Sequence, residues 1–101
     1  KVDSVGLSLK KITDTMRRDY AIPPSVDGVA IVSVDPKSEA AQKGLFEGDI
    51  IVEINQTPVS DPEKAKEIIE KATENGRSSI LLLINREDEV RFLALKLKKD
   101  E

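Results

Sequence analysis

Hydrophobic and polar residues alternate with a period of two in several blocks of the chain, and this pattern predicts five strands. In the third block, Ile50, Val52 and Ile54 alternate with Ile51, Glu53 and Asn55. The last two blocks are separated by the polar turn "REDE", which indicates a hairpin. The predicted strands cover residues 5–12, 28–34, 49–55, 78–85 and 90–97.

Three helices are predicted between these strands from their start and stop signals. Thr13 is a suitable N-cap for a short helix that carries Met16 and Tyr20 on one face, and Pro23-Pro24 stops it. A second short helix passes through Ala40-Ala41 and ends at Gly44. A longer helix follows Ser60 or Asp61 as cap, has Pro62 at its first position and ends at Gly76.

Two glycines in "KGLFEGDII", residues 43–51, raise the question of a phosphate-binding loop. Such loops run from strand to glycines to helix, so that the positive helix N-terminus faces the anion. Here a short helix precedes the glycines and a strand follows them, which is the reverse order. We therefore interpret Gly44 as a helix end and Gly48 as part of a tight turn.

Composition excludes several classes of function. The 101 residues contain no His and no Cys, which removes Cys–His nucleophile pairs and the usual zinc sites. The net charge is −3 and only 3% of residues are aromatic, so neither a basic patch nor stacking platforms for nucleic acid are expected. No apolar stretch approaches the roughly 20 residues of a membrane span. We expect no metal and no cofactor.

The segment "VDPKSEAAQKGLFEGDIIVEINQTPV", residues 34–59, resembles the signature of bacterial PDZ domains. The resemblance extends from "SVGLSL" to "FLAL". The inserted "TDTMRRDYAIPPSVDG" and the ending "RSSILLLINREDEVRFLALKL" are most similar to the C-terminal (second) PDZ domain of HtrA/Do-like periplasmic serine proteases. C-terminal processing proteases and intramembrane metalloproteases remain alternative parents.

This resemblance implies a fold and a context. The expected fold is α+β, a partly open antiparallel barrel or sandwich of five to six strands with one long helix and one or two short helices. Residues 1–101 would form a single PDZ domain. Because residue 1 is Lys, we expect a processed product or a piece of a longer protein. The resemblance implies that this protein is periplasmic.

The resemblance also implies a site at the first predicted strand. PDZ domains bind an extended peptide as an added strand, and a glycine-containing loop holds the peptide carboxylate. Ser4, Val5, Gly6 and Leu7 match the "Gly-Leu-Gly-Phe" loop, with Ser4 in place of the first glycine. Leu7, Ser8 and Leu9 would then line the groove. Val5, Leu7 and Leu9 share one face, so the alternative is that they are core residues.

The long helix would supply the other wall of the groove. Ala65, Ile69 and Ala72 form one helical stripe, whereas Ile68 is offset and is expected to face the core. Ala65 matches the position where many PDZ domains carry a histidine that selects Ser or Thr. We therefore expect an apolar preference two residues before the peptide terminus. The alternative is that the whole stripe is core.

The leading hypothesis is a module that binds peptide C-termini or unfolded polypeptides, as a substrate-recognition or regulatory domain of a serine endoprotease. The alternative is a structural domain that docks on neighbouring protease or PDZ domains and controls oligomer assembly. This chain should not be an enzyme, because the catalytic residues of such a parent lie in a separate domain. The acidic residues around the long helix are interpreted as a solvated, salt-bridged face, and the Arg86–Glu89 turn as a polar hairpin tip. These acidic residues are Asp61, Glu63, Glu67 (spaced for Lys71) and Glu70.

Overall fold

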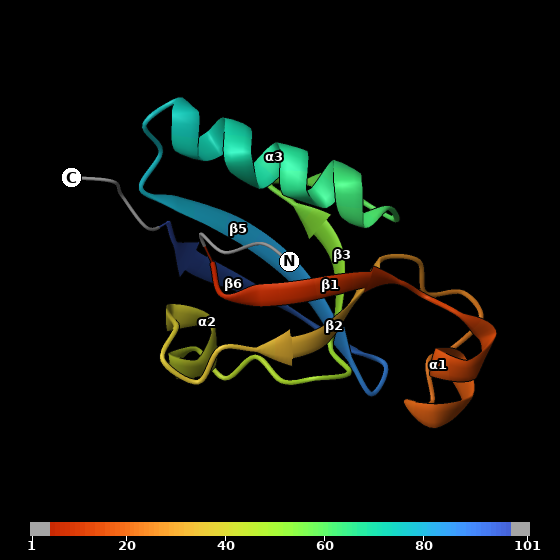
Figure 1. Ribbon diagram of the computed structural model, residues 1–101. Helices are drawn as coiled ribbons and strands as arrows, with labels where there is room; N and C mark the ends of the chain where they lie inside the picture. Colours follow the sequence, from red (N-terminus) through yellow and green to blue (C-terminus); the bar gives the residue numbers. More distant parts are fainter. Residues whose placement is uncertain (1–4, 98–101) are drawn as a thin grey trace.

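The computed structural model describes residues 5–97, which form a six-stranded antiparallel sheet and three helices (Figure 1). The strand order is β1-β2-β3-β5-β6, and β4 pairs with β3 off this path. β1 and β6 are therefore the two edges of the sheet. This arrangement confirms the expected α+β fold. The strands are β1 (Leu7–Lys11), β2 (Val29–Val34), β3 (Ile50–Ile54), β4 (Thr57–Pro58), β5 (Ser79–Arg86) and β6 (Glu89–Lys96), and the helices are α1 (Asp14–Asp19), α2 (Glu39–Gln42) and α3 (Pro62–Glu74).

α3 covers one face of the sheet (Figure 1). Its start follows the expected signals, because the Asp61 carboxylate accepts a hydrogen bond from the Glu63 N–H at 3.0 Å and Pro62 occupies the first turn. Gly76, with φ of 76°, ends it as expected. The buried residues of α3 belong to the main core, together with Val29, Ile31 and Ile51 of the central strands.

α1 packs against the margin of the opposite face of the sheet. Its Met16 and Tyr20 pack against a second cluster that includes Ala30 and Ile50, the chain neighbours of residues in the main core. Adjacent strand residues point to opposite faces, so the two clusters lie on opposite sides of the sheet. The helix ends at Asp19, earlier than the expected stop at Pro23-Pro24, because Ala21 adopts a left-handed φ of 53°.

The predicted alternation along β3 is wrong after Val52. Ile51 pairs with Ile84 and Glu53 pairs with Leu83, so Val52 is an extra residue in β3, a β-bulge. The bulge shifts the phase of the side chains, and Ile54 therefore joins the main core instead of following Val52 into the second cluster.

A partly buried ion pair joins the loop before β3 to the end of β5. Arg86 donates from Nε to Asp49 Oδ1 at 2.7 Å and from Nη2 to Asp49 Oδ2 at 2.6 Å, and it also donates to the Gly44 carbonyl oxygen. Asp49 is 2% exposed, and these hydrogen bonds raise the pKa of Arg86. The Phe46 N–H donates to the same carboxylate, which holds the turn together. Arg86 therefore holds this loop against the end of β5, a contact that lies outside the polar hairpin tip expected for residues 86–89.

Candidate functional site

The loop before β1 is built around Gly6. Its φ is 72°, in the left-handed region. A Cβ at this position would lie 2.4 Å from the Ser38 Cβ and 3.2 Å from the Asp35 Cβ. The turn that starts α2 therefore packs directly against the Gly6 backbone, and both the conformation and the space require glycine.

The orientation of the Leu7 N–H follows from one hydrogen bond made by the preceding residue. The Asp35 N–H donates to the Gly6 carbonyl oxygen at 2.8 Å, so this oxygen points toward the end of β2. The described chain contains no cis peptide bond. In a trans peptide the N–H points opposite to the C=O, so the Leu7 N–H points away from β2. It is directed toward the edge of the sheet.

The pairing of β1 extends this pattern along the strand. Among the described residues, β2 is the only strand that pairs with β1. The bond from Asp35 to Gly6 flanks the Leu7–Val34 pair, which makes that pair the non-hydrogen-bonded kind. The main-chain groups of Leu7, and by alternation those of Leu9, therefore face the outer edge. β1 thus presents donors and acceptors on the side where a further strand can add.

Apolar side chains from β1 and α3 meet beside this edge. All six residues predicted for the two walls lie in the main core and are at most 8% exposed. The structure brings the two walls together as expected, but their burial is also that of ordinary core residues. Ser8, on the opposite face of β1, is half-buried. Ile68, expected in the core, is only half-buried and packs at its margin. The wall residues are Val5, Leu7, Leu9, Ala65, Ile69 and Ala72.

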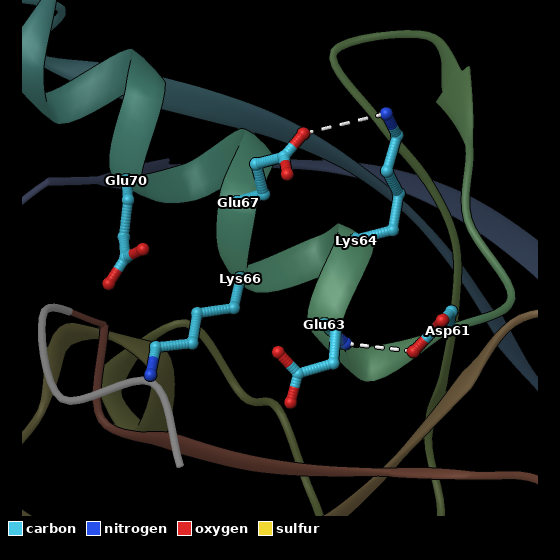
Figure 2. Close-up of a pocket in the computed structure, with 6 residues that line it drawn as sticks. All are labelled: Asp61, Glu63, Lys64, Lys66, Glu67 and Glu70. Atoms are coloured by element: carbon cyan, nitrogen blue, oxygen red, sulfur yellow. Dashed lines mark hydrogen bonds and ion pairs between the residues drawn. The ribbon is translucent and has the colours of Figure 1, made fainter.

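Charged side chains of α3 line a shallow hollow of about 430 Å³ on the helix surface (Figure 2). Glu63, Lys66 and Glu70 extend on the side of the helix that faces β1, whereas Lys64 and Glu67 lie on the other side. The spacing of three and four residues explains why the first three share one side. They form a charged rim beside the β1 edge, which the sequence analysis had treated only as a solvated face.

Two acidic residues, Glu67 within α3 and Asp61 just before it, have structural partners. Glu67 lies 3.6 Å from the Lys64 ammonium rather than pairing with Lys71, and Asp61 caps the helix. Within residues 5–97, no group of three or more carboxylates or other ligating side chains is placed to hold a metal ion. In the same range, no helix is both long and apolar enough to cross a membrane.

The loop around Gly6 includes one predicted residue that the structure does not describe and two contacts that the sequence did not reveal. Ser4, the first residue of the expected carboxylate loop, lies outside the described residues. Asp35 and Ser38, which pack against Gly6, were noted in the sequence only as part of the segment that resembles PDZ domains. Their contact with Gly6 joins segments about 30 residues apart, and no local pattern indicates it.

Comparisons with known proteins agree with this geometry. A family model described as "PDZ domain" matches residues 30–86. A protein of Bartonella henselae named "Probable periplasmic serine endoprotease DegP-like" is 40% identical over 91 residues, which cover 86% of this chain and 18% of that protein. A protein of the same name from Rhizobium meliloti is 40% identical over 78 residues, 75% of this chain and 16% of that protein. The chain thus spans under a fifth of the length of these relatives.

Solved structures show the same fold. The crystal structure of the HtrA3 PDZ domain bound to a phage-derived ligand (FGRWV) superposes with a TM-score of 0.73 and 23% identity, covering 93% of this chain and 83% of that chain. The HtrA-type protease AlgW with decapeptide gives a TM-score of 0.77 and 18% identity, covering 96% and 29% of the two chains. The region matched in the proteases is a non-catalytic portion.

Proposed function

The chain belongs to the PDZ domain family, and on this premise we propose that it binds the free carboxyl end of an extended polypeptide as an added strand at β1. The observation that carries the proposal is the outward-directed Leu7 N–H, next to a left-handed glycine and an apolar wall. An amide in this position donates to a carboxylate, and the remaining edge groups of β1 pair with the peptide main chain. Ser4, Val5 and Gly6 complete the proposed carboxylate loop.

The side-chain preferences of the groove follow from its walls. The last residue of the peptide would lie against Leu7 and Ile69, which favours an apolar side chain. The residue two positions earlier would face Ala65, which offers neither a donor nor an acceptor. We therefore expect an apolar side chain there as well. Both walls are already packed in the core, so binding requires the α3 side chains to adjust, and the affinity should be micromolar or weaker.

A titration with matched peptides tests the proposal. Two peptides with apolar residues at the last and third-last positions would differ only in a free or an amidated carboxyl end. A lost charge-assisted hydrogen bond is worth about 1.5–3 kcal/mol, so the free acid should bind at least about tenfold more tightly. NMR shifts on binding should be largest at the Leu7 and Leu9 amides. Equal binding of both peptides, or binding of neither, contradicts the proposal.

The wider context is a protease. The relatives are named periplasmic serine endoproteases, which supports the expected periplasmic location. We propose that the domain captures substrates or regulates proteolysis in such a parent, whose catalytic residues lie elsewhere. Adding saturating apolar peptide to the full-length parent should change its cleavage rate, and Gly6→Ala should abolish that response.

A docking role within a protease assembly is the second candidate, and β6 favours it. Val90 and Phe92 lie on one face of this edge strand and are 63% and 61% exposed. Exposed apolar residues of this size are typical of contacts between proteins. In the parent, Phe92→Ser should then shift the oligomer distribution in analytical ultracentrifugation while peptide affinity remains unchanged. An unchanged distribution argues against docking through this face.

A further inference from the structure

A cavity of about 520 Å³ lies at the end of β1 opposite to Gly6. Its volume is within the roughly 300–1,000 Å³ range of small ligand sites. It is formed where four segments meet: the end of β1, the loop before β2, β3 at Val52, and the segment that leads from β4 into α3. The residues that carry the argument are Lys11, Ser25, Asp27, Pro58, Val59 and Ser60.

The cavity continues the proposed groove. A peptide that pairs antiparallel with β1, with its carboxylate at Leu7, has its third-last residue opposite Leu9 and its fifth-last opposite Lys11. Each further residue advances the chain by about 3.4 Å. The extra residue of the β1–β2 bulge lies in β2, because Ser8 pairs with Ser33 and Leu9 with Ile31, so β1 keeps its alternation. The Lys11 side chain is therefore on the same face as Leu7 and Leu9.

The chemistry of the cavity favours an anion. Lys11 contributes an ammonium group, and Ser25 and Ser60 contribute hydroxyl donors. Asp27 is the one carboxylate among the residues that line it, and its Oδ1 lies 3.7 Å from the Arg17 guanidinium. Arg17 does not line the cavity, but its charge offsets that of Asp27 and leaves Lys11 as the cation of the lining. Val59 is buried and Pro58 has no N–H, so they provide an apolar base beneath these donors.

We propose that this cavity is a second subsite, which takes an acidic side chain located four to six residues before the carboxyl end of the bound polypeptide. The inference rests on the proposed function, because it needs a peptide at β1. It adds a charge preference upstream of the residues that contact α3. Substrates with an apolar end preceded by Asp or Glu would be selected over those with a neutral upstream segment.

Three synthetic peptides with the same last four residues test this subsite by calorimetry or fluorescence anisotropy. One has four residues, one has nine with Glu at the positions four, five and six before the terminus, and one has nine with Gln there. A partly exposed ion pair is worth little, so the Glu peptide should bind about three- to fivefold more tightly than the Gln peptide. Lys11→Gln should remove this difference.

Lys10→Gln is the matched control, because Lys10 is an equally exposed neighbour whose side chain points to the other face of β1. It should leave the preference for Glu intact. Equal binding of the Glu and Gln peptides to the unmodified domain, or an equal loss in both lysine variants, overturns the subsite while the four-residue peptide still binds. Failure of all three peptides to bind overturns the proposed function together with the subsite.

Discussion

The two edge strands of the sheet, β1 and β6, differ in length and in the exposure of their apolar side chains. β1 has five residues, and Leu7 and Leu9 are buried against the core that α3 covers. β6 has eight residues, and Val90 and Phe92 are more than 60% exposed. The longer and more accessible edge is thus not the one proposed to bind peptides.

The difference shows what a peptide site needs besides unpaired main-chain groups. β1 has a helix alongside it and a left-handed glycine that turns an amide outward. At β6, the Leu97 N–H donates to the Ser78 carbonyl oxygen, so the neighbouring Lys96 N–H points outward, where the Glu39 carboxylate accepts it at 2.6 Å. A side chain thus occupies part of this edge, and the charges of Arg91 and Lys96 discourage further pairing.

The largest effect is expected from Asp49, which joins the loop before β3 to the end of β5 and lies at neither edge. Asp49→Ala leaves Arg86 without its partner in a mostly buried position, and should lower the free energy of unfolding by about 3–5 kcal/mol. Urea denaturation followed by circular dichroism measures this. Glu67→Gln, which breaks the exposed pair with Lys64, is the control and should cost less than about 1 kcal/mol. Similar losses in both variants would show that burial of the pair is unimportant.

The second largest effect is expected at Gly6, where a substitution should weaken peptide binding as well as stability. Gly6→Ala introduces a Cβ against Ser38 as well as a left-handed alanine, and should weaken peptide binding at least about tenfold and cost about 1–3 kcal/mol of stability. Gly76→Ala is the matched control, because Gly76 has a similar φ of 76° but no atom within 4 Å of the added Cβ. It should cost about 1 kcal/mol at most and leave peptide affinity unchanged. Wild-type affinity in Gly6→Ala would contradict the proposed loop.

A smaller effect is expected at the wall beside β1. Ile69 is fully buried, so Ile69→Val removes one methylene group and should lower stability by about 0.5–1.5 kcal/mol. The same change should alter affinity for peptides that end in a large apolar residue. Titration with peptides ending in Val and in Phe would reveal a change in their ratio. An unchanged ratio would indicate that Ile69 belongs to the core alone.

The smallest effect is expected at β6. Phe92→Ser replaces a side chain that is 61% exposed, so it should change the stability of the isolated domain by less than about 0.5 kcal/mol. Peptide affinity should also stay within a factor of about two. A large loss of peptide binding in this variant would place the peptide at β6 and reverse the comparison between the edges.

Sequence reasoning succeeded where the determining contacts are local. Thr13 accepts from the Met16 N–H at 3.1 Å, Asp61 caps α3, and Gly44 and Gly76 end their helices as expected. Each of these features depends on residues within four positions of one another. The stripe Ala65, Ile69 and Ala72 was also found from its spacing, because a helix buries residues three and four apart.

The errors arose from contacts between distant segments. The bulge at Val52 is stabilised by pairing with β5, about 30 residues later, so the alternation of β3 alone could not reveal it. Arg86 was interpreted only as part of a polar hairpin tip, whereas it pairs with Asp49, 37 residues earlier. The cavity beside Lys11 combines four segments, and its residues share no pattern in the sequence.

One short helix has a consequence for both margins of the domain. Ser38, at the start of α2, accepts from the Ala41 N–H and lies against Gly6, while the adjacent Glu39 holds the last amide of β6. Ser38 and Glu39 therefore connect the β1 edge of the sheet to the β6 edge through α2. A displacement of α2 should therefore affect both edges together. Hydrogen exchange of the Lys96 amide should report on conformational changes at Gly6.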